Sequence, residues 1–301
     1  MGPQKGLTAQ NTVAHAAGDI ASCLSPFDEM TADLFDRRPG TILASGDLAY
    51  ASGAAWEFLL GDGPSWGRHR AWTRPAVGNH EVETRGARDD ARRPTEGDDS
   101  FDHAGGHLVS RNTNCGEIGG CGRDTPQGRW LRADLAAHPN RCTLAYMHHP
   151  RFSAGQHGSS TGPQPLWGML YAADADLVLV GHDHHDERFA PMRPDGMRDD
   201  VRGMRQFLVG SGGIFHSALA ATQPHSEVRN NDTHGVLELT LRPDRYDWRF
   251  IPVAGRTFTD TGSARCHGPL HGAHASRAYR AGRKYSRLPT SSTLWRSQAA
   301  P

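Results

Sequence analysis

The sequence lacks an excess of charge of either sign, and it has no long apolar run. Its 33 Lys and Arg residues are balanced by 33 Asp and Glu residues, so a general attraction to nucleic acid or to an anionic membrane surface is not expected. No stretch approaches the roughly 18 consecutive apolar residues of a membrane helix, and residues 1–12 lack the apolar core of a signal peptide. These absences argue against a membrane or nucleic acid as a partner, and no protein partner is evident.

Cysteine is also scarce, since 5 residues in 301 are too few for a disulfide scaffold. Cys115 and Cys121 lie six residues apart in a glycine-rich loop, close enough in sequence for a small bridge. Cys23, Cys142 and Cys266 are scattered, and the odd count leaves at least one thiol unpaired within the chain. Reduced cysteines in a cytosolic enzyme fit this pattern equally well.

Histidine, by contrast, is abundant, because the chain holds 18 of them, many in short clusters. Imidazole is the commonest metal-binding side chain, so this surplus directs attention to a metal site. Hydrophobic residues make up 37% of the chain, which also holds 35 Gly and 19 Pro. Such a composition is typical of a globular protein with many loops.

Short apolar runs alternate with amphipathic stretches from residue 11 to about residue 260, which predicts one α/β domain over 11–260. Strands are expected within residues 12–19, 40–47, 74–81, 141–150, 176–185 and 206–213, and the strand at 40–47 is expected to be buried. Helices are expected over 27–35, 126–138 and 165–175, and a terminal hairpin over 235–241 and 246–253. Residues 1–10 are predicted to be an extension, 81–100 a mobile loop and 261–301 a weakly ordered basic tail.

Five of the predicted strands end at residues that can bind a metal. Their spacings are 28, 32, 69 and 34 residues, and the residues are Asp19, Asp47, Asn79, His148 and His182. A single Gly-Asp after a strand is usually a turn, and a single histidine is usually structural. A series of five is hard to explain in that way. Loops at the carboxyl ends of strands in an open α/β sheet converge, so the series predicts one shared metal site.

The motifs around these residues supply further donors. Gly46-Asp47-Leu48-Ala49-Tyr50 contains a carboxylate and a phenol, and Gly78-Asn79-His80-Glu81 contains an amide, an imidazole and a carboxylate that could orient it. Met147-His148-His149-Pro150 and Gly181-His182-Asp183-His184 supply imidazoles. Arg151 and Arg188 follow closely and are candidates for contact with a substrate phosphate, although arginine is more often simply a surface residue.

This ordered set resembles the calcineurin-like metallophosphoesterases, and within them the purple acid phosphatase branch in its compact bacterial form. Most members of the wider family carry Asp-x-His at the first motif, whereas here Ile20 and Ala21 follow Asp19. Tyr50 stands where purple acid phosphatases place their metal-binding tyrosine. The resemblance covers about residues 19 to 188 and implies a four-layer αββα sandwich of two mixed β-sheets flanked by helices.

The resemblance also implies a binuclear metal centre. One ion would be held by Asp19, Tyr50 and His184, a second by Asn79, His148 and His182, and Asp47 would bridge them. The phenolate and carboxylates suit Fe(III), whereas imidazoles and an amide oxygen suit a divalent ion such as Zn, Fe or Mn. His80 is the expected catalytic acid, with Glu81 as its orienting partner.

The reaction implied is hydrolysis of phosphomonoesters, small phosphate-ester substrates, by in-line attack of a metal-bound hydroxide. A phosphodiesterase or nucleotidase on the same scaffold is an alternative, because the pocket walls rather than the metal ligands set the ester class. A catalytically silent metal-binding module is another. Because related bacterial forms are often secreted, a secreted or periplasmic location is expected, with the cytoplasm as the alternative.

Overall fold

A computed structural model describes residues 12–84, 99–220 and 222–268, which form two mixed β-sheets. The first sheet has the strand order β13-β12-β11-β1-β2-β3. Its strands are β1 (Val13–Ala17), β2 (Thr41–Ala44), β3 (Thr73–Pro75), β11 (Gly235–Arg242), β12 (Arg245–Pro252) and β13 (Thr261–Arg265). The second has the order β10-β8-β9-β7-β6-β5-β4. Its strands are β4 (Asp99–His103), β5 (Gly106–Ser110), β6 (Cys142–Tyr146), β7 (Leu177–Val180), β8 (Asp186–Phe189), β9 (Arg205–Val209) and β10 (Ser226–Asn230).

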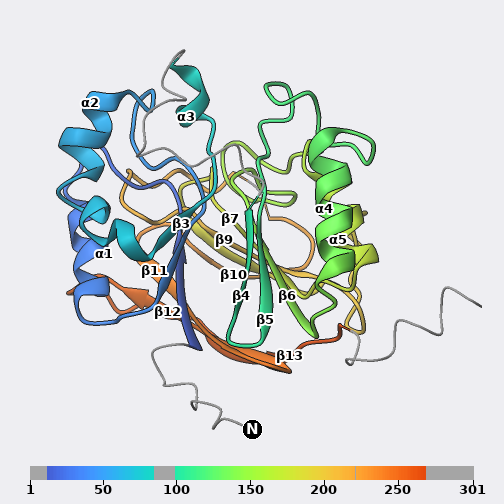
Figure 1. Ribbon diagram of the computed structural model, residues 1–301. Helices are drawn as coiled ribbons and strands as arrows, with labels where there is room; N and C mark the ends of the chain where they lie inside the picture. Colours follow the sequence, from blue (N-terminus) through green and yellow to red (C-terminus); the bar gives the residue numbers. More distant parts are fainter. Residues whose placement is uncertain (1–11, 85–98, 221, 269–301) are drawn as a thin grey trace, which may run out of the picture.

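Helices cover the outer faces of both sheets, as Figure 1 shows. On the side of the first sheet lie α1 (Phe27–Asp36), α2 (Ala55–Glu57), the π-helix Phe58–Asp62 and the 3-10 helix Trp66–Trp72. On the side of the second sheet lie α4 (Pro126–Ala137) and α5 (Gln164–Ala172), and α3 (His80–Glu83) sits near the edge where α2 lies. The four-layer αββα sandwich expected from the sequence is therefore confirmed.

Strand β7 shows why its sequence reads as a continuous apolar run. Side chains alternate across a strand, so Leu177 and Leu179 enter the core between the sheets. Val178 and Val180 enter the second core, under α4 and α5. A parallel strand covered on both faces needs apolar residues at every position, and this places β7 in the centre of the molecule.

The parallel strands bring their carboxyl ends to one edge. β1, β2 and β3 run parallel in the first sheet, and β5, β6, β7 and β9 run parallel in the second. Backbone hydrogen bonds join the two sheets at this edge, where Gly18 N donates to Val209 O at 2.8 Å. The loops that follow β1, β2, β3, β6 and β7 meet there, so the predicted convergence of the motif loops is confirmed.

Several local predictions can be compared with the described residues. The helix expected over 126–138 is α4, whose first turn is capped by Thr125 accepting from Gly128 N at 3.2 Å, and the expected hairpin is β11 and β12. The expected mobile loop at 81–100 has its ends in α3 and β4, while residues 85–98 lie outside the described residues. The predicted 1–10 extension also lies outside them.

The tail boundary at residue 261 needs correction. Thr261–Arg265 pairs antiparallel with β12 as strand β13, in place of the weakly ordered segment expected there. This strand has no alternation of apolar residues from which it could be predicted, because it lies at the sheet edge and three of its five residues are exposed. The rest of the predicted tail, 269–301, lies outside the described residues.

Two disulfides are present among the described residues. Cys115 bonds to Cys121, which is the pairing that their spacing allowed, and Cys142 bonds to Cys266 across 124 residues. The second bridge was not foreseen, since it depends on β13 returning to the start of β6. Cys23 is free and exposed. No helix in the described ranges has the length and apolar character needed to cross a membrane.

Candidate metal centre

The structure brings all seven predicted metal-binding side chains to the edge where the carboxyl ends of the parallel strands meet. They lie in or just beyond the loops that follow five different strands. They are Asp19 after β1, Asp47 and Tyr50 after β2, Asn79 after β3, His148 after β6, and His182 and His184 after β7. Asp19, Asp47 and His148 are fully or almost fully buried.

One group of donors surrounds the Tyr50 hydroxyl. This hydroxyl lies 2.9 Å from Asp19 Oδ1, 3.0 Å from Asp47 Oδ2 and 3.3 Å from His184 Nε2. A hydroxyl has a single proton, so it can donate to only one of the two carboxylates at a time. The group is rich in hard, anionic oxygen donors.

A second group surrounds the side-chain oxygen of Asn79. Asn79 Oδ1 lies 2.9 Å from His148 Nε2 and 3.0 Å from His182 Nδ1, and these two ring nitrogens are 3.2 Å apart. Asp47 Oδ2 lies 3.2 Å from His148 Nε2, so Asp47 contacts both groups. Two nitrogens and two oxygens pointing at one small volume form a set that a cation can satisfy.

The pKa values of His148 and Asp47 also indicate that positive charge is stabilised at this position. Burial would lower the pKa of His148, but the carboxylates of Asp47 and Asp19 raise it to about 10. Burial would raise the pKa of Asp47, yet His148 and His80 lower it below its usual value. A proton on His148 therefore supplies, in the chain by itself, positive charge that a bound metal ion would otherwise supply.

Burial and the charges beside them also shift the pKa values of the neighbouring groups. Burial and the positive His148 lower the pKa of His182 to about 2, and the same two causes lower that of His149 to about 3. Both imidazoles are thus neutral near pH 7, the form in which a nitrogen can bind a metal. Burial and the two carboxylates raise the pKa of Tyr50 well above its usual value.

The backbone at this edge is strained at the donors themselves. Asp19, Asp47 and His182 have φ values of 61°, 51° and 73°, in the left-handed region that non-glycine residues rarely adopt. Such strain clusters at functional sites. Gly78 is also required, because a Cβ there would lie 2.0 Å from Asp47 Oδ1.

The expected pairing of His80 with Glu81 is not what the structure shows. Glu81 accepts the backbone N–H groups of Asp47 at 2.9 Å, Leu48 at 2.8 Å and Gly78 at 2.7 Å, and so fixes two motif loops together. His80 Nδ1 instead lies 2.5 Å from the carbonyl oxygen of Ala51. The orienting role expected of Glu81 is thus met by a backbone carbonyl, which sequence motifs do not reveal.

His157 is a candidate site residue that the sequence did not single out. Its ring centroid lies 4.5 Å from that of His182. The ring centroid of His149 also lies 4.5 Å from that of His182. His157 is exposed, so it stands at the mouth of the centre. It follows no strand directly, which is why the pattern of strand ends did not include it.

Neither arginine considered from the sequence is free to meet a substrate. Arg188 forms ion pairs with Asp260, at 2.7 Å, and with Glu227. The guanidinium of Arg151 donates to the backbone carbonyl of Pro194 at 3.3 Å. Both act within the fold.

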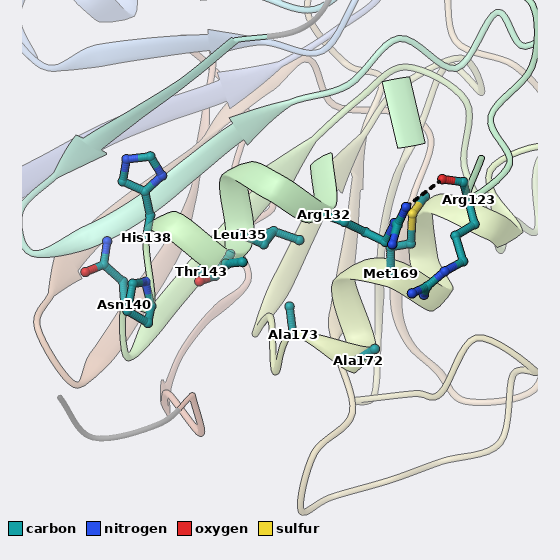
Figure 2. Close-up of a pocket in the computed structure, with 11 residues that line it drawn as sticks. Arg123, Arg132, Leu135, His138, Asn140, Thr143, Met169, Ala172 and Ala173 are labelled. Carbon is teal, nitrogen blue, oxygen red and sulfur yellow. Dashed lines mark hydrogen bonds between the residues drawn. The ribbon is translucent and has the colours of Figure 1, made fainter. Parts of the chain in front are cut away.

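Two other features lie away from this edge. His107 sits between Asp102 at 3.0 Å and Asp134 at 2.8 Å, so both ring nitrogens are satisfied by carboxylates. A cavity of about 440 Å³ lies beside α4 and α5. Leu135, Met169 and two arginines are among the residues that line it (Figure 2). It contains none of the seven donors, and it is not the candidate metal centre.

The fold and this arrangement of donors define a class of protein. The chain belongs to the calcineurin-like phosphoesterase family, whose model matches residues 15–186. An uncharacterized protein of Mycobacterium tuberculosis is 28% identical over 272 residues, covering 70% of this chain and 48% of that protein. Purple acid phosphatase 21 of Arabidopsis thaliana is 32% identical over 120 residues, covering 38% of this chain and 26% of that protein. The chain thus spans at most about half the length of these curated relatives.

Solved structures show the same fold. A purple acid phosphatase from yellow lupin seeds matches with a TM-score of 0.66 at 17% identity, covering 84% of this chain and 53% of that one. A protein described as GAP50, the anchor in the inner membrane complex of Plasmodium, matches with a TM-score of 0.60 at 14% identity, covering 94% and 99% of the two chains. At these identities the likeness concerns the fold.

Proposed function

We propose that the protein is a binuclear metal-dependent phosphatase that hydrolyses phosphomonoesters. The observation that carries this proposal is the position of Asp47, whose carboxylate contacts the Tyr50 hydroxyl at 3.0 Å and the His148 ring at 3.2 Å. A carboxylate shared by two separate donor groups is what a bridging ligand requires. Membership of the phosphoesterase family supports the reaction class.

The donor chemistry fits two different ions. Asp19, Tyr50 and His184 would hold Fe(III), because a phenolate and a carboxylate are hard anionic ligands. Asn79, His148 and His182 would hold a divalent ion such as Zn, Fe or Mn, and Asp47 would bridge. When bound, two such ions supply a hydroxide nucleophile near neutral pH and neutralise the charge that develops on the phosphoryl group.

His80 is proposed as the general acid. Its Nδ1–H donates to Ala51 O, which fixes the ring, while Nε2 faces the centre 3.7 Å from Asp47 Oδ2. With a proton on both nitrogens, Nε2 can release one to the leaving alkoxide oxygen. His149 and His157 border the His182 side of the centre and are proposed to face the substrate phosphate.

Steady-state hydrolysis with metal analysis tests this function. We expect the purified protein to hydrolyse an aryl monophosphate faster than a bis-aryl phosphate, and Asp47→Ala to lose both the second metal ion and the activity. Asp102→Ala, which alters a carboxylate beside His107 far from the centre, is the matched control and should leave both unchanged. Faster hydrolysis of the diester would favour the phosphodiesterase alternative.

A catalytically silent metal-binding module is the competing function. The fold alone does not decide, since one structural relative is described as an anchor. The placement of His80 favours an enzyme, because a module that only stores metal has no need of an imidazole fixed beside the bridging carboxylate. Tight uptake of two metal ions with no hydrolysis of any phosphate ester would support the module.

We also propose that the protein works in an oxidising compartment. Two disulfides, Cys115–Cys121 and Cys142–Cys266, support this, because such bonds are rare in the reducing cytosol. Thiol titration of protein isolated from its native source should find one reactive thiol per chain, on Cys23. Five reactive thiols would contradict the proposal.

A further inference from the structure

The loop Ser153–His157, which carries His157 to the mouth of the centre, has no regular secondary structure. Its backbone N–H groups therefore need partners other than a helix or a sheet ladder. Two buried carboxylates supply them, one from the loop after β7 and one from strand β8. Asp183 Oδ1 accepts from His157 N at 2.8 Å, and Glu187 Oε2 accepts from Ala154 N at 2.8 Å.

Of these two carboxylates, Asp183 makes the shortest hydrogen bond with the loop. It is fully buried, and its second oxygen accepts from the Ser153 hydroxyl at 2.5 Å. The Ser153 oxygen in turn accepts from Gly155 N at 2.9 Å. One carboxylate thus holds the first and last residues of the loop, and it also organises the middle through Ser153.

The packing at Gly155 shows how tightly the loop is seated. A Cβ on Gly155 would lie 2.4 Å from Asp183 Cγ and 2.5 Å from Oδ1. No side chain of any size fits between the loop and the carboxylate. Gly155 and Asp183 therefore both determine where the loop lies.

We propose that Asp183 is a positioning residue for the substrate phosphate, acting through the loop Ser153–His157. By accepting the His157 N–H, it holds the His157 imidazole beside His182, 4.5 Å between ring centroids. The role rests on the proposed function, in which His157 faces the phosphate. Asp183 itself does not touch the substrate.

Three variants test this role. Asp183→Ala removes the acceptor, Gly155→Ala pushes the loop from the other side, and His157→Ala removes the imidazole. Each should raise the KM for an aryl monophosphate and the dissociation constant of inorganic phosphate about tenfold, the scale of one lost hydrogen bond to a charged group. The metal content should stay at two ions per chain, and kcat should change less than KM. Asp183→Asn keeps an acceptor oxygen and should recover part of the effect.

A double variant separates positioning from a general structural role. Because Asp183 acts through His157, adding Asp183→Ala to His157→Ala should cause no further increase in KM. Amide hydrogen exchange gives a second measure, since protection of the His157 N–H should fall in Asp183→Ala. The control is Asp176→Ala, which removes another buried carboxylate that accepts two backbone N–H groups, at the opposite end of β7. Its KM should equal that of the wild type.

Three results would overturn the proposal. The first is an unchanged phosphate affinity in Asp183→Ala and Gly155→Ala with two metal ions bound. The second is additive effects in the double variant. The third is loss of metal in Asp183→Ala alone, which would assign Asp183 to the placement of His182 and His184. Phosphate binding and hydrogen exchange remain measurable even if the wild type hydrolyses no ester, so failure of the proposed function is recognised separately.

Discussion

At the scale of single residues, the proposed reaction depends most on how His80 is held. Its Nδ1 is committed to the Ala51 carbonyl, and its Nε2 faces the bridging carboxylate of Asp47. A fixed ring with one free N–H can deliver a proton in one direction. This arrangement is needed only where the leaving group requires protonation.

His80→Ala should therefore discriminate between leaving groups. For an alkyl phosphate, whose alkoxide is a poor leaving group, kcat should fall about 10²–10⁴-fold, the usual contribution of a positioned acid. For a nitrophenyl phosphate, kcat should change little. Equal losses on the two substrates, measured side by side with metal content, would contradict the role.

His234 gives a pH prediction that is independent of substrate. It is buried, stacks on Phe27 with ring centroids 4.0 Å apart, and donates to Ile214 O at 2.9 Å. Burial lowers its pKa to about 4. In the unfolded chain a histidine has a pKa of about 6.5, so the unfolded state takes up this proton at a higher pH than the folded state does. The neutral His234 therefore contributes to the free energy of unfolding above about pH 6.5, and this contribution is lost as the pH falls toward 4.

Denaturant unfolding of chelator-treated protein at pH 7 and pH 5 measures this contribution. The wild type should lose more free energy of unfolding over that interval than His234→Gln, which cannot titrate. If the two proteins lose equal amounts, the pKa of His234 is not lowered in the folded state.

How far the sequence could predict the site depends on how each residue reaches it. Asp19, Asn79 and His182 lie shortly after strands, and their positions followed from the apolar runs before them. Glu81 and His157 have their roles through contacts with loops distant in sequence. Those contacts depend on how the loops fold, which neither spacing nor residue type reveals.

At the scale of elements, the edge strand β13 is stabilised by pairing with its neighbour, and its own sequence shows no strand pattern. β13 pairs with β12 in the register Trp248 to Gly262, and the lack of a side chain on Gly262 lets the Trp248 ring lie against the strand. The central strand β7, by contrast, is recognisable from four apolar residues in succession. Central strands were thus predictable, whereas β13 depends on its partner and on the Cys142–Cys266 bond that follows it.

That bond should contribute more to stability than the shorter one. A cross-link restricts the unfolded chain more when the loop it closes is longer, and typical values are about 2–4 kcal/mol. Replacing Cys142 and Cys266 by serine should lower the free energy of unfolding by more than replacing Cys115 and Cys121. Denaturant unfolding of both double variants measures the two effects. If removing the Cys142–Cys266 bond, which spans 124 residues, lowers the free energy of unfolding by the same amount or less, the prediction is wrong.

At the scale of the whole molecule, the two sheets meet at the edge where seven donors from five loops converge. Their convergence requires the sandwich, since Asp19, Asp47 and Asn79 follow strands of the first sheet, and the three histidines follow strands of the second. A protein that binds metal ions only in the folded state is stabilised by them. Metal removal should therefore lower the melting temperature of the wild type, and Asp47→Ala should show a smaller shift between the metal-loaded and chelated forms.

The most direct test of the binuclear centre is a metal titration of chelator-treated protein, monitored by visible absorption and by hydrolysis of an aryl phosphate. Two ions per chain should bind, full activity should require the second, and Fe(III) should produce a purple band that Tyr50→Phe abolishes. Full activity at one ion per chain, or an identical band in Tyr50→Phe, would contradict the proposed centre.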